Sequence, residues 1–298
     1  MKKLLSSLLL LLASSSAMAN LTIFACEPEW AALSQELGGD KVKVFSATTG
    51  LQDPHYIQAR PSLIAKARQA DLLVCTGAEL ESGWLPLLQR KAGNSAIQTG
   101  AAGYFIATDY VTLKAIPSSL DRSLGDVHAA GNPHIQTSPI NIQLVAKALT
   151  KRLQDLDAGN APFYQQRSED FNRRWQDAIE QWQQQAVPLN GLSIVVQHDS
   201  WLYLFDWLDL NKAAVLEEKP GVSPTVNALN KVLNHLKKSP AKLVIHAAYQ
   251  SPRATDWLVD KTAMSKVTLP FTVGGNEQST DLFSLFDDTI QRLLAAHK

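Results

Sequence analysis

The sequence predicts an α/β protein with two parallel-sheet lobes joined by one long, rigid helix. Short apolar runs rich in β-branched residues alternate with longer stretches of helical periodicity, which is typical of βαβ units on a parallel sheet. These runs form two sets, separated by roughly 100 residues with little strand signal. Between the sets, residues 162–187 contain no glycine and continue one helical pattern.

The first lobe is expected over residues 20–150. Its strands are predicted at 21–25, 42–47 and 71–76, from the runs LTIFA, VKVFSA and DLLVCT. The stretch PEWAALSQELGG follows the first strand with helical periodicity, and its final glycine pair is a typical helix stop.

The second lobe is expected over residues 190–298. Its strands are predicted at 192–197, 213–217, 242–247 and 266–271. One helix of this lobe is expected in SPTVNALNKVLNHLKK, with Ser223 as N-cap, Pro224 at the first helical position and lysines in the last turn. Both lobes therefore show the alternation of a parallel α/β fold.

The connecting segment, residues 151–189, contains the predicted long helix at 162–187. At 1.5 Å per residue this helix would reach about 39 Å, which suits a strut between two lobes better than a connection inside one. Pro188 and Gly191 are expected to end it. The aromatic anchors for the two lobes are expected to be Phe163, Phe171, Trp175 and Trp182.

The charge balance argues against a nucleic-acid partner. Of 298 residues, 28 are Lys or Arg and 28 are Asp or Glu, so the basic excess that suits a phosphate backbone is missing. The hydrophobic share of 45% is that of a folded globular protein.

Residues 1–19 are predicted to be a secretory signal peptide. Lys2 and Lys3 precede a short apolar run, and Ala17-Met18-Ala19 provides an A-x-A site with cleavage after Ala19. No later apolar run approaches the ~20 residues of a membrane span. Cys26 lies seven residues beyond that site, and Phe24 is bulky where a lipobox needs a small residue. We therefore expect an exported, soluble, monomeric protein in the periplasm.

Two cysteines, Cys26 and Cys75, follow apolar runs that are predicted strands. In an oxidising compartment they are a possible disulfide, provided their Cα atoms come within about 7 Å. The alternative is two buried, inert thiols, because free cysteine is among the most buried residue types. The residues alone leave both open.

Three of the seven histidines occupy positions where α/β proteins bind ligands, beyond the carboxyl ends of strands or on loops beside them. His55 follows the strand predicted at 42–47, His134 lies in a loop rich in glycine and proline, and His198 directly follows the strand predicted at 192–197. Three imidazoles suit zinc. Spacing alone is equally compatible with ordinary surface histidines or with a site for a small anion.

The surroundings of these histidines resemble the metal-specific substrate-binding proteins of ABC importers, in the zinc/manganese cluster. The matching segments are DPH followed by RPS (53–62), IAKARQADLLVCTGAELESGWL (64–85), GNPHIQTSPIN (131–141), VVQHDSWLYLFDWLDL (195–210), EEKPGVSPT (217–225) and LPFTVGG (269–275). They cover nearly all of the chain after residue 19, in the order of the family, whose members also have a long central helix.

The resemblance implies that His55, His134 and His198 hold a metal ion in the cleft between the lobes, for delivery to a membrane permease. The manganese branch has a carboxylate at the third position, so His198 favours Zn²⁺. The family's usual aspartate after the last strand is missing here. Water, His246, Glu277 and Asp281 are the alternatives for a fourth ligand, with water or a weak contact from His246 favoured.

The expected function is therefore binding and not enzymatic catalysis, with one Zn²⁺ per chain. The family's long histidine-rich loop is reduced to GDVHAAGN, leaving only His128, while His235 and His297 are expected to be solvated. A manganese or iron binder of the same fold is one alternative. A secreted zinc hydrolase is another, with Asp199 as its base, because three histidines and an open water position also make a catalytic zinc site.

Overall fold

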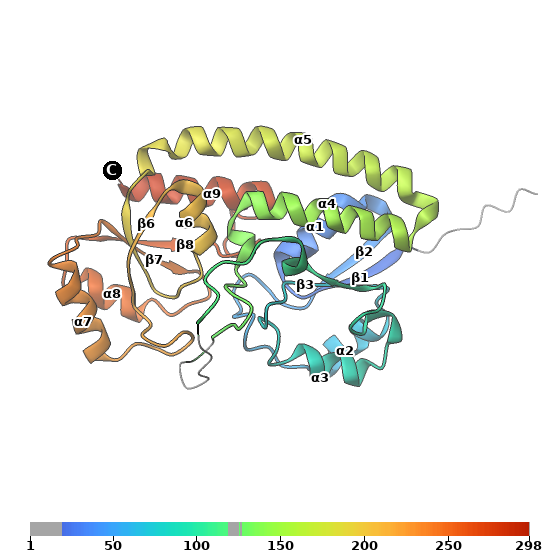
Figure 1. Ribbon diagram of the computed structural model, residues 1–298, viewed down its shortest axis with the longest axis horizontal. Helices are drawn as coiled ribbons and strands as arrows, with labels where there is room; N and C mark the ends of the chain where they lie inside the picture. The colour runs from blue at the N-terminus through green and yellow to red at the C-terminus, as the bar shows by residue number, and fades with distance from the viewer. Residues whose placement is uncertain (1–19, 119–124, 126, 298) are drawn as a thin grey trace, which may run out of the picture.

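The computed structural model describes residues 20–118, 125 and 127–297, which form two lobes, each on a four-stranded parallel sheet (Figure 1). The segment 1–19, expected to be a signal peptide, lies outside the described residues. None of the described helices is long and apolar enough to cross a membrane.

The first lobe has the strand order β2-β1-β3-β4, and every pair is parallel. Its elements are β1 (Leu21–Ala25), α1 (Pro28–Gly38), β2 (Val42–Ser46), α2 (Pro61–Arg68), β3 (Leu72–Cys75), α3 (Leu85–Ala92) and β4 (Tyr104–Ile106). The connections reverse direction at β1, so the carboxyl ends of β1 and β3 border the crevice where such sheets bind ligands.

The second lobe repeats this arrangement with the order β6-β5-β7-β8, again all parallel. Its elements are β5 (Ser193–Val196), α6 (Leu202–Leu208), β6 (Asn211–Val215), α7 (Val226–Leu236), β7 (Leu243–Ala247), α8 (Arg253–Val259), β8 (Ser265–Leu269) and α9 (Leu282–His297). The prediction of two parallel-sheet α/β lobes is confirmed.

The expected long helix is present as α5 (Ala161–Ala186), preceded by α4 (Pro139–Leu156). Figure 1 shows α5 lying across both lobes, with α4 and α9 beneath it. The indole N–H of Trp175 donates to the carbonyl of Pro139 at 2.8 Å, and that of Trp182 donates to Asp287 at 2.6 Å. These bonds tie the strut to α4 in one direction and to α9 in the other. The position 150, where the first lobe was expected to end, lies inside α4.

The largest hydrophobic core is continuous between the lobes. It combines one face of each sheet with the inner faces of α4, α5 and α9, including the fully buried Trp175 and Phe171. The other face of each sheet has its own smaller cluster, one under α2 and α3, one under α7 and α8. Because the shared core spans the junction, the loops at the facing ends of the sheets are held in a defined arrangement.

Two local predictions differ from the structure. The first sheet has a fourth strand, β4, which at three residues is too short for an alternating pattern to reveal. The N-cap of α7 is Thr225 and not Ser223, since the Thr225 side chain accepts the Ala228 N–H at 3.1 Å. Ser223 and Pro224 therefore both lie before the helix, which begins at Val226.

Candidate metal centre

Four histidine rings converge where the two lobes meet. His55 lies on the loop after β2, His134 just before α4, and His198 two residues after β5. Their ring centres are 5.5 Å apart for His55 and His134, 5.7 Å for His134 and His198, and 6.1 Å for His55 and His198. The three histidines singled out from the sequence are thus brought together from both lobes.

The fourth ring is His128, on the connection between β4 and α4. Its centre is 5.3 Å from that of His55 and 6.2 Å from that of His134. The two Nε2 atoms of His55 and His128 are 3.3 Å apart. Ligand atoms of His55, His128 and His134 lie within 4.8 Å of one another, close enough to bind a single ion. From the sequence, His128 is expected only as the remaining histidine of a shortened loop.

Carboxylates orient two of these rings. His55 Nδ1 lies 2.7 Å from Asp53 Oδ1, and His198 Nδ1 lies 2.7 Å from Glu217 Oε2. An ionised carboxylate only accepts hydrogen bonds, so each Nδ1 carries a proton, and in the neutral ring the lone pair is then on Nε2. Burial by itself raises the pKa of Asp53, but the hydrogen bonds and charge of His55 outweigh it and lower that pKa below its ordinary value.

A backbone carbonyl performs the same function for His128. The Nδ1 of His128 lies 3.0 Å from the carbonyl oxygen of Ala78, which can only accept. His128 therefore also carries a proton on Nδ1, and its Nε2 faces the Nε2 of His55 at 3.3 Å. Three of the four rings share one tautomer, and that tautomer suits metal coordination.

His134 is the most buried of the four, with 1% of its surface exposed. Among the described residues neither of its ring nitrogens has a hydrogen-bond partner, which is rare for a buried polar group. Burial, followed by the neighbouring histidines, holds its pKa well below the ordinary value, so the ring stays neutral. Phe271 from the second lobe covers it at 5.3 Å between ring centres. A neutral, buried imidazole without partners is well suited to be a metal ligand.

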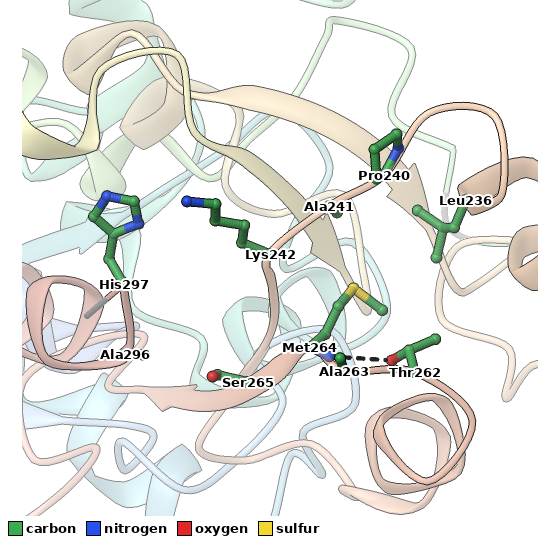
Figure 2. A pocket seen from close by; sticks show the side chains of 10 residues that line it. All are labelled: Leu236, Pro240, Ala241, Lys242, Thr262, Ala263, Met264, Ser265, Ala296 and His297. Atoms are coloured by element: carbon green, nitrogen blue, oxygen red, sulfur yellow. Dashed lines mark hydrogen bonds between the residues drawn. The ribbon is translucent and has the colours of Figure 1, made fainter.

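A pocket of about 200 Å³ opens beside the cluster and is lined by both lobes. Asp53 and His55 line it from the first lobe, and His198 and Glu217 from the second. Figure 2 shows a larger pocket, of about 510 Å³, at the other end of the second lobe, where Lys242 and His297 contribute its charged or titratable side chains. Only the smaller pocket contacts the clustered histidines.

His246 lies apart from this cluster. It is buried in β7, where its Nε2 is 3.1 Å from the hydroxyl of Thr268 on β8 and its Nδ1 is 3.4 Å from the hydroxyl of Thr255 on α8. Burial, and then the charge of Lys266, lower its pKa. The structure thus engages both nitrogens of His246 inside the second lobe.

The remaining candidates from the sequence are also elsewhere. Asp281 accepts the backbone N–H of Ser284 at 2.7 Å at the start of α9, and Glu277 is exposed. His235 is exposed in the last turn of α7. Asp199, considered as a catalytic base, pairs through both carboxylate oxygens with Lys212 at 2.7 Å.

Cys26 and Cys75 form a disulfide, with their Cα atoms 4.8 Å apart at the adjacent ends of β1 and β3. A carboxylate oxygen of Glu81 lies within 4.8 Å of both sulfur atoms. Because both sulfurs are bonded to each other, neither is a thiolate, and this group is not a metal site.

The residues missed by sequence reasoning are His128, Asp53 and Glu217. Asp53 belongs to the quoted D-P-H motif and Glu217 begins the quoted segment EEKPG, so both were within matched blocks. No local spacing links Glu217 to His198, because parallel strands β5 and β6 bring them together across the sheet.

Comparison with known proteins connects this geometry to metal transport. Residues 23–296 match the family described as ZnuA, zinc-uptake complex component A, periplasmic. The chain is 25% identical over 224 residues to the metal ABC transporter substrate-binding lipoprotein SloC of Streptococcus mutans, covering 74% of this chain and 70% of that protein. It is also 25% identical to the manganese ABC transporter substrate-binding lipoprotein PsaA of Streptococcus pneumoniae, over 81% and 77%.

A crystal structure of ZnuA has the same fold. It superposes with a TM-score of 0.75 over 94% of this chain and 100% of that one, at 20% sequence identity. At this identity the likeness establishes the fold alone.

Proposed function

We propose that this chain captures Zn²⁺ in the periplasm and delivers it to a membrane permease. The premise is that the chain belongs to the family described as ZnuA, the periplasmic component of a zinc-uptake complex. Proteins of this family bind a metal ion for an ABC transporter and are not enzymes. The zinc hydrolase considered from the sequence is therefore set aside. The choice of zinc, the compartment and a monomeric state are part of the proposal.

The observation that carries the proposal is the convergence of four imidazoles. Three rings have Nδ1 bound to an oxygen acceptor, and the Nε2 atoms of two of them, His55 and His128, lie 3.3 Å apart. The fourth ring, His134, is buried with both nitrogens unpartnered among the described residues. Zinc is typically bound by four ligands in a tetrahedron and accepts imidazole nitrogen well, whereas manganese prefers oxygen ligands. His55, His134 and His198 with His128 as a fourth ligand would complete such a sphere.

Export to the periplasm agrees with the disulfide. Disulfides persist in oxidising compartments, and Cys26 bonded to Cys75 is not available as the lipid-bearing cysteine of a lipoprotein. The relatives SloC and PsaA are named lipoproteins, so this chain would differ from them in how it is kept near its permease. A cleaved segment 1–19 would supply the export signal.

Manganese capture is the second candidate, because PsaA is named a manganese protein. Against it stands the donor set, since the candidate third ligand is His198 and not a carboxylate, and its carboxylate neighbour Glu217 is held on the imidazole. The two candidates therefore predict different metals from the same pocket.

The deciding experiment measures metal identity and affinity together. Protein purified from the periplasm is analysed for metals by mass spectrometry, and the apo form is titrated with Zn²⁺ and Mn²⁺ in competition with a chelator. We expect one Zn²⁺ per chain and much weaker Mn²⁺ binding. Tighter binding of Mn²⁺ than of Zn²⁺, or two equally tight zinc sites, would contradict the proposal.

Matched histidine variants locate the site. His134→Ala should weaken zinc by several kcal/mol, because structural zinc binding totals about 10–16 kcal/mol over its ligands. His235→Ala is the control, since that ring is exposed on α7. Equal affinities for the two variants would place the metal elsewhere.

A further inference from the structure

The turn after β3 has an unusual backbone. Three consecutive residues are in the left-handed region, with φ of 87° at Gly77, 47° at Ala78 and 68° at Glu79. Glycine accepts this conformation freely, but for alanine and glutamate it costs roughly 1–2 kcal/mol each. Such a turn persists only where its surroundings hold it in place.

Buried groups hold the start of this turn. Glu81 Oε1 accepts the N–H of Thr76 at 2.7 Å, and Glu81 Oε2 accepts that of Gly77 at 3.0 Å. The residue before Thr76 is Cys75, whose disulfide with Cys26 ties the end of β3 to that of β1. The first residues of the turn are therefore held by the disulfide and by two hydrogen bonds to Glu81.

The outer part of the turn contacts the loop that carries His128. The carbonyl of Ala78 accepts from His128 Nδ1 at 3.0 Å, and the carboxylate of Glu79 accepts the backbone N–H of Ala129 at 2.8 Å. One bond sets the direction of the imidazole, and the other holds the backbone beside it. Both depend on the left-handed conformation that places Ala78 and Glu79 where they are.

The far end of the same segment contacts the loop that carries His55. The indole N–H of Trp84 donates to the carbonyl of Pro54 at 3.0 Å. Gly83 approaches the carbonyl of His55 so closely that an added Cβ would lie 3.2 Å from it. Residues 77–84 thus contact the backbone next to His55 and the ring of His128.

We propose that residues 77–84 are a brace that sets the separation of His55 and His128, and that Glu79 is a positioning residue that makes His128 the fourth metal ligand. This inference rests on the proposed function and adds to it a determinant of metal selectivity. With the brace intact the fourth donor is an imidazole nitrogen, which favours zinc. Without it the position passes to water, an oxygen donor that manganese accepts more readily.

The test compares Glu79→Ala and Glu79→Gln in the full chain, each with and without His128→Ala. Zn²⁺ affinity is measured by chelator competition, and the visible spectrum of the Co²⁺-loaded protein reports coordination number. Glu180→Ala, which removes an exposed glutamate on α5, is the matched control.

We expect Glu79→Ala to weaken zinc by about tenfold, the lower end for loss of a group that orients a ligand. Glu79→Gln should retain most of the affinity, because its amide oxygen can still accept from Ala129. The alanine variant should also weaken the cobalt absorption, as expected for a ligand sphere that has lost its tetrahedral geometry. In the His128→Ala background, Glu79→Ala should change nothing further.

Three results would overturn the inference. An equal loss from Glu79→Ala with and without His128 would show that Glu79 acts independently of that ring. Unchanged affinity and cobalt spectrum in Glu79→Ala would show that the brace does not position the ligand. Unchanged zinc affinity in His128→Ala would show that His128 is not a metal ligand. If His134→Ala still lowered the zinc affinity, the proposed function would remain intact.

Discussion

A buried carboxyl group joins the two lobes and makes their stability depend on pH. Glu29, in the first turn of α1, has 1% of its surface exposed. Its carboxylate accepts a hydrogen bond from the hydroxyl of Thr272, which lies on the loop after β8. Burial raises the pKa of Glu29 from 4.5 to about 7, against the opposing effect of the Thr272 hydrogen bond. The charge of the nearby buried Glu81 contributes to this rise.

The sign of the effect follows from this shift. Well below pH 4.5 the carboxyl is protonated in both the folded and the unfolded chain, so Glu29 does not lower the free energy of unfolding. As the pH rises from 4.5 to about 7, the unfolded chain releases a proton that the folded chain retains, and stability falls. At about 1.4 kcal/mol per pKa unit, the free energy of unfolding is about 3 kcal/mol lower above neutral pH than it is below pH 4.5.

The variant Glu29→Gln should remove this penalty, because the amide is neutral at every pH and its oxygen can still accept from Thr272. We expect it to raise the free energy of unfolding by up to about 3 kcal/mol at pH 8 and by almost nothing at pH 4.5. Urea unfolding of the apo protein at pH 4.5, 6, 7 and 8 measures the difference from wild type.

Two other buried carboxyl groups lie near Glu29. Burial raises the pKa of Glu27 and of Glu81 in both proteins, but the part of the Glu27 rise that comes from the charge of Glu29 is lost in Glu29→Gln. The difference between the two proteins therefore reports Glu29 together with its coupling to Glu27. Glu169→Gln, on the exposed side of α5, is the control and should be neutral. A stability difference that is constant across this pH range, or a Glu29→Gln variant less stable at pH 8, would refute the reasoning.

Three further predictions follow from the site and its surroundings. Glu217→Ala should weaken zinc binding about 10–100-fold by freeing the His198 ring, and an unchanged dissociation constant would rule out that orienting function. Replacing both Cys26 and Cys75 by serine should lower the free energy of unfolding by about 2–5 kcal/mol in urea titrations, and the loss should match that of the wild type under reductant. His246→Ala should change zinc affinity far less than His198→Ala in the same chelator competition, because both ring nitrogens of His246 are engaged with Thr255 and Thr268. A larger loss of affinity in His246→Ala than in His198→Ala would mean that the second-lobe ligand lies on β7.

Local patterns predicted most of the elements because each carries its own signal. Six of the seven predicted strands begin within one residue of the observed ones, since continuous apolar runs mark buried parallel strands. The seventh, predicted at 213–217, is observed at Asn211–Val215, where its polar first two residues extend the pairing beyond the apolar run. A three-residue strand such as β4 has no period to detect.

From the amino-acid sequence we could predict the two-lobe architecture, the long helix and three histidines whose surrounding motifs resemble a family of metal carriers. Those features depend on residues that are neighbours along the chain, where periodicity and motif spacing are visible. The packing of the folded chain was needed to show that His128 joins the cluster, that Glu217 orients His198, and that His246 is engaged within its own lobe. Each of these contacts pairs residues far apart in sequence, and its geometry is set by how sheets and turns pack, which no local pattern encodes.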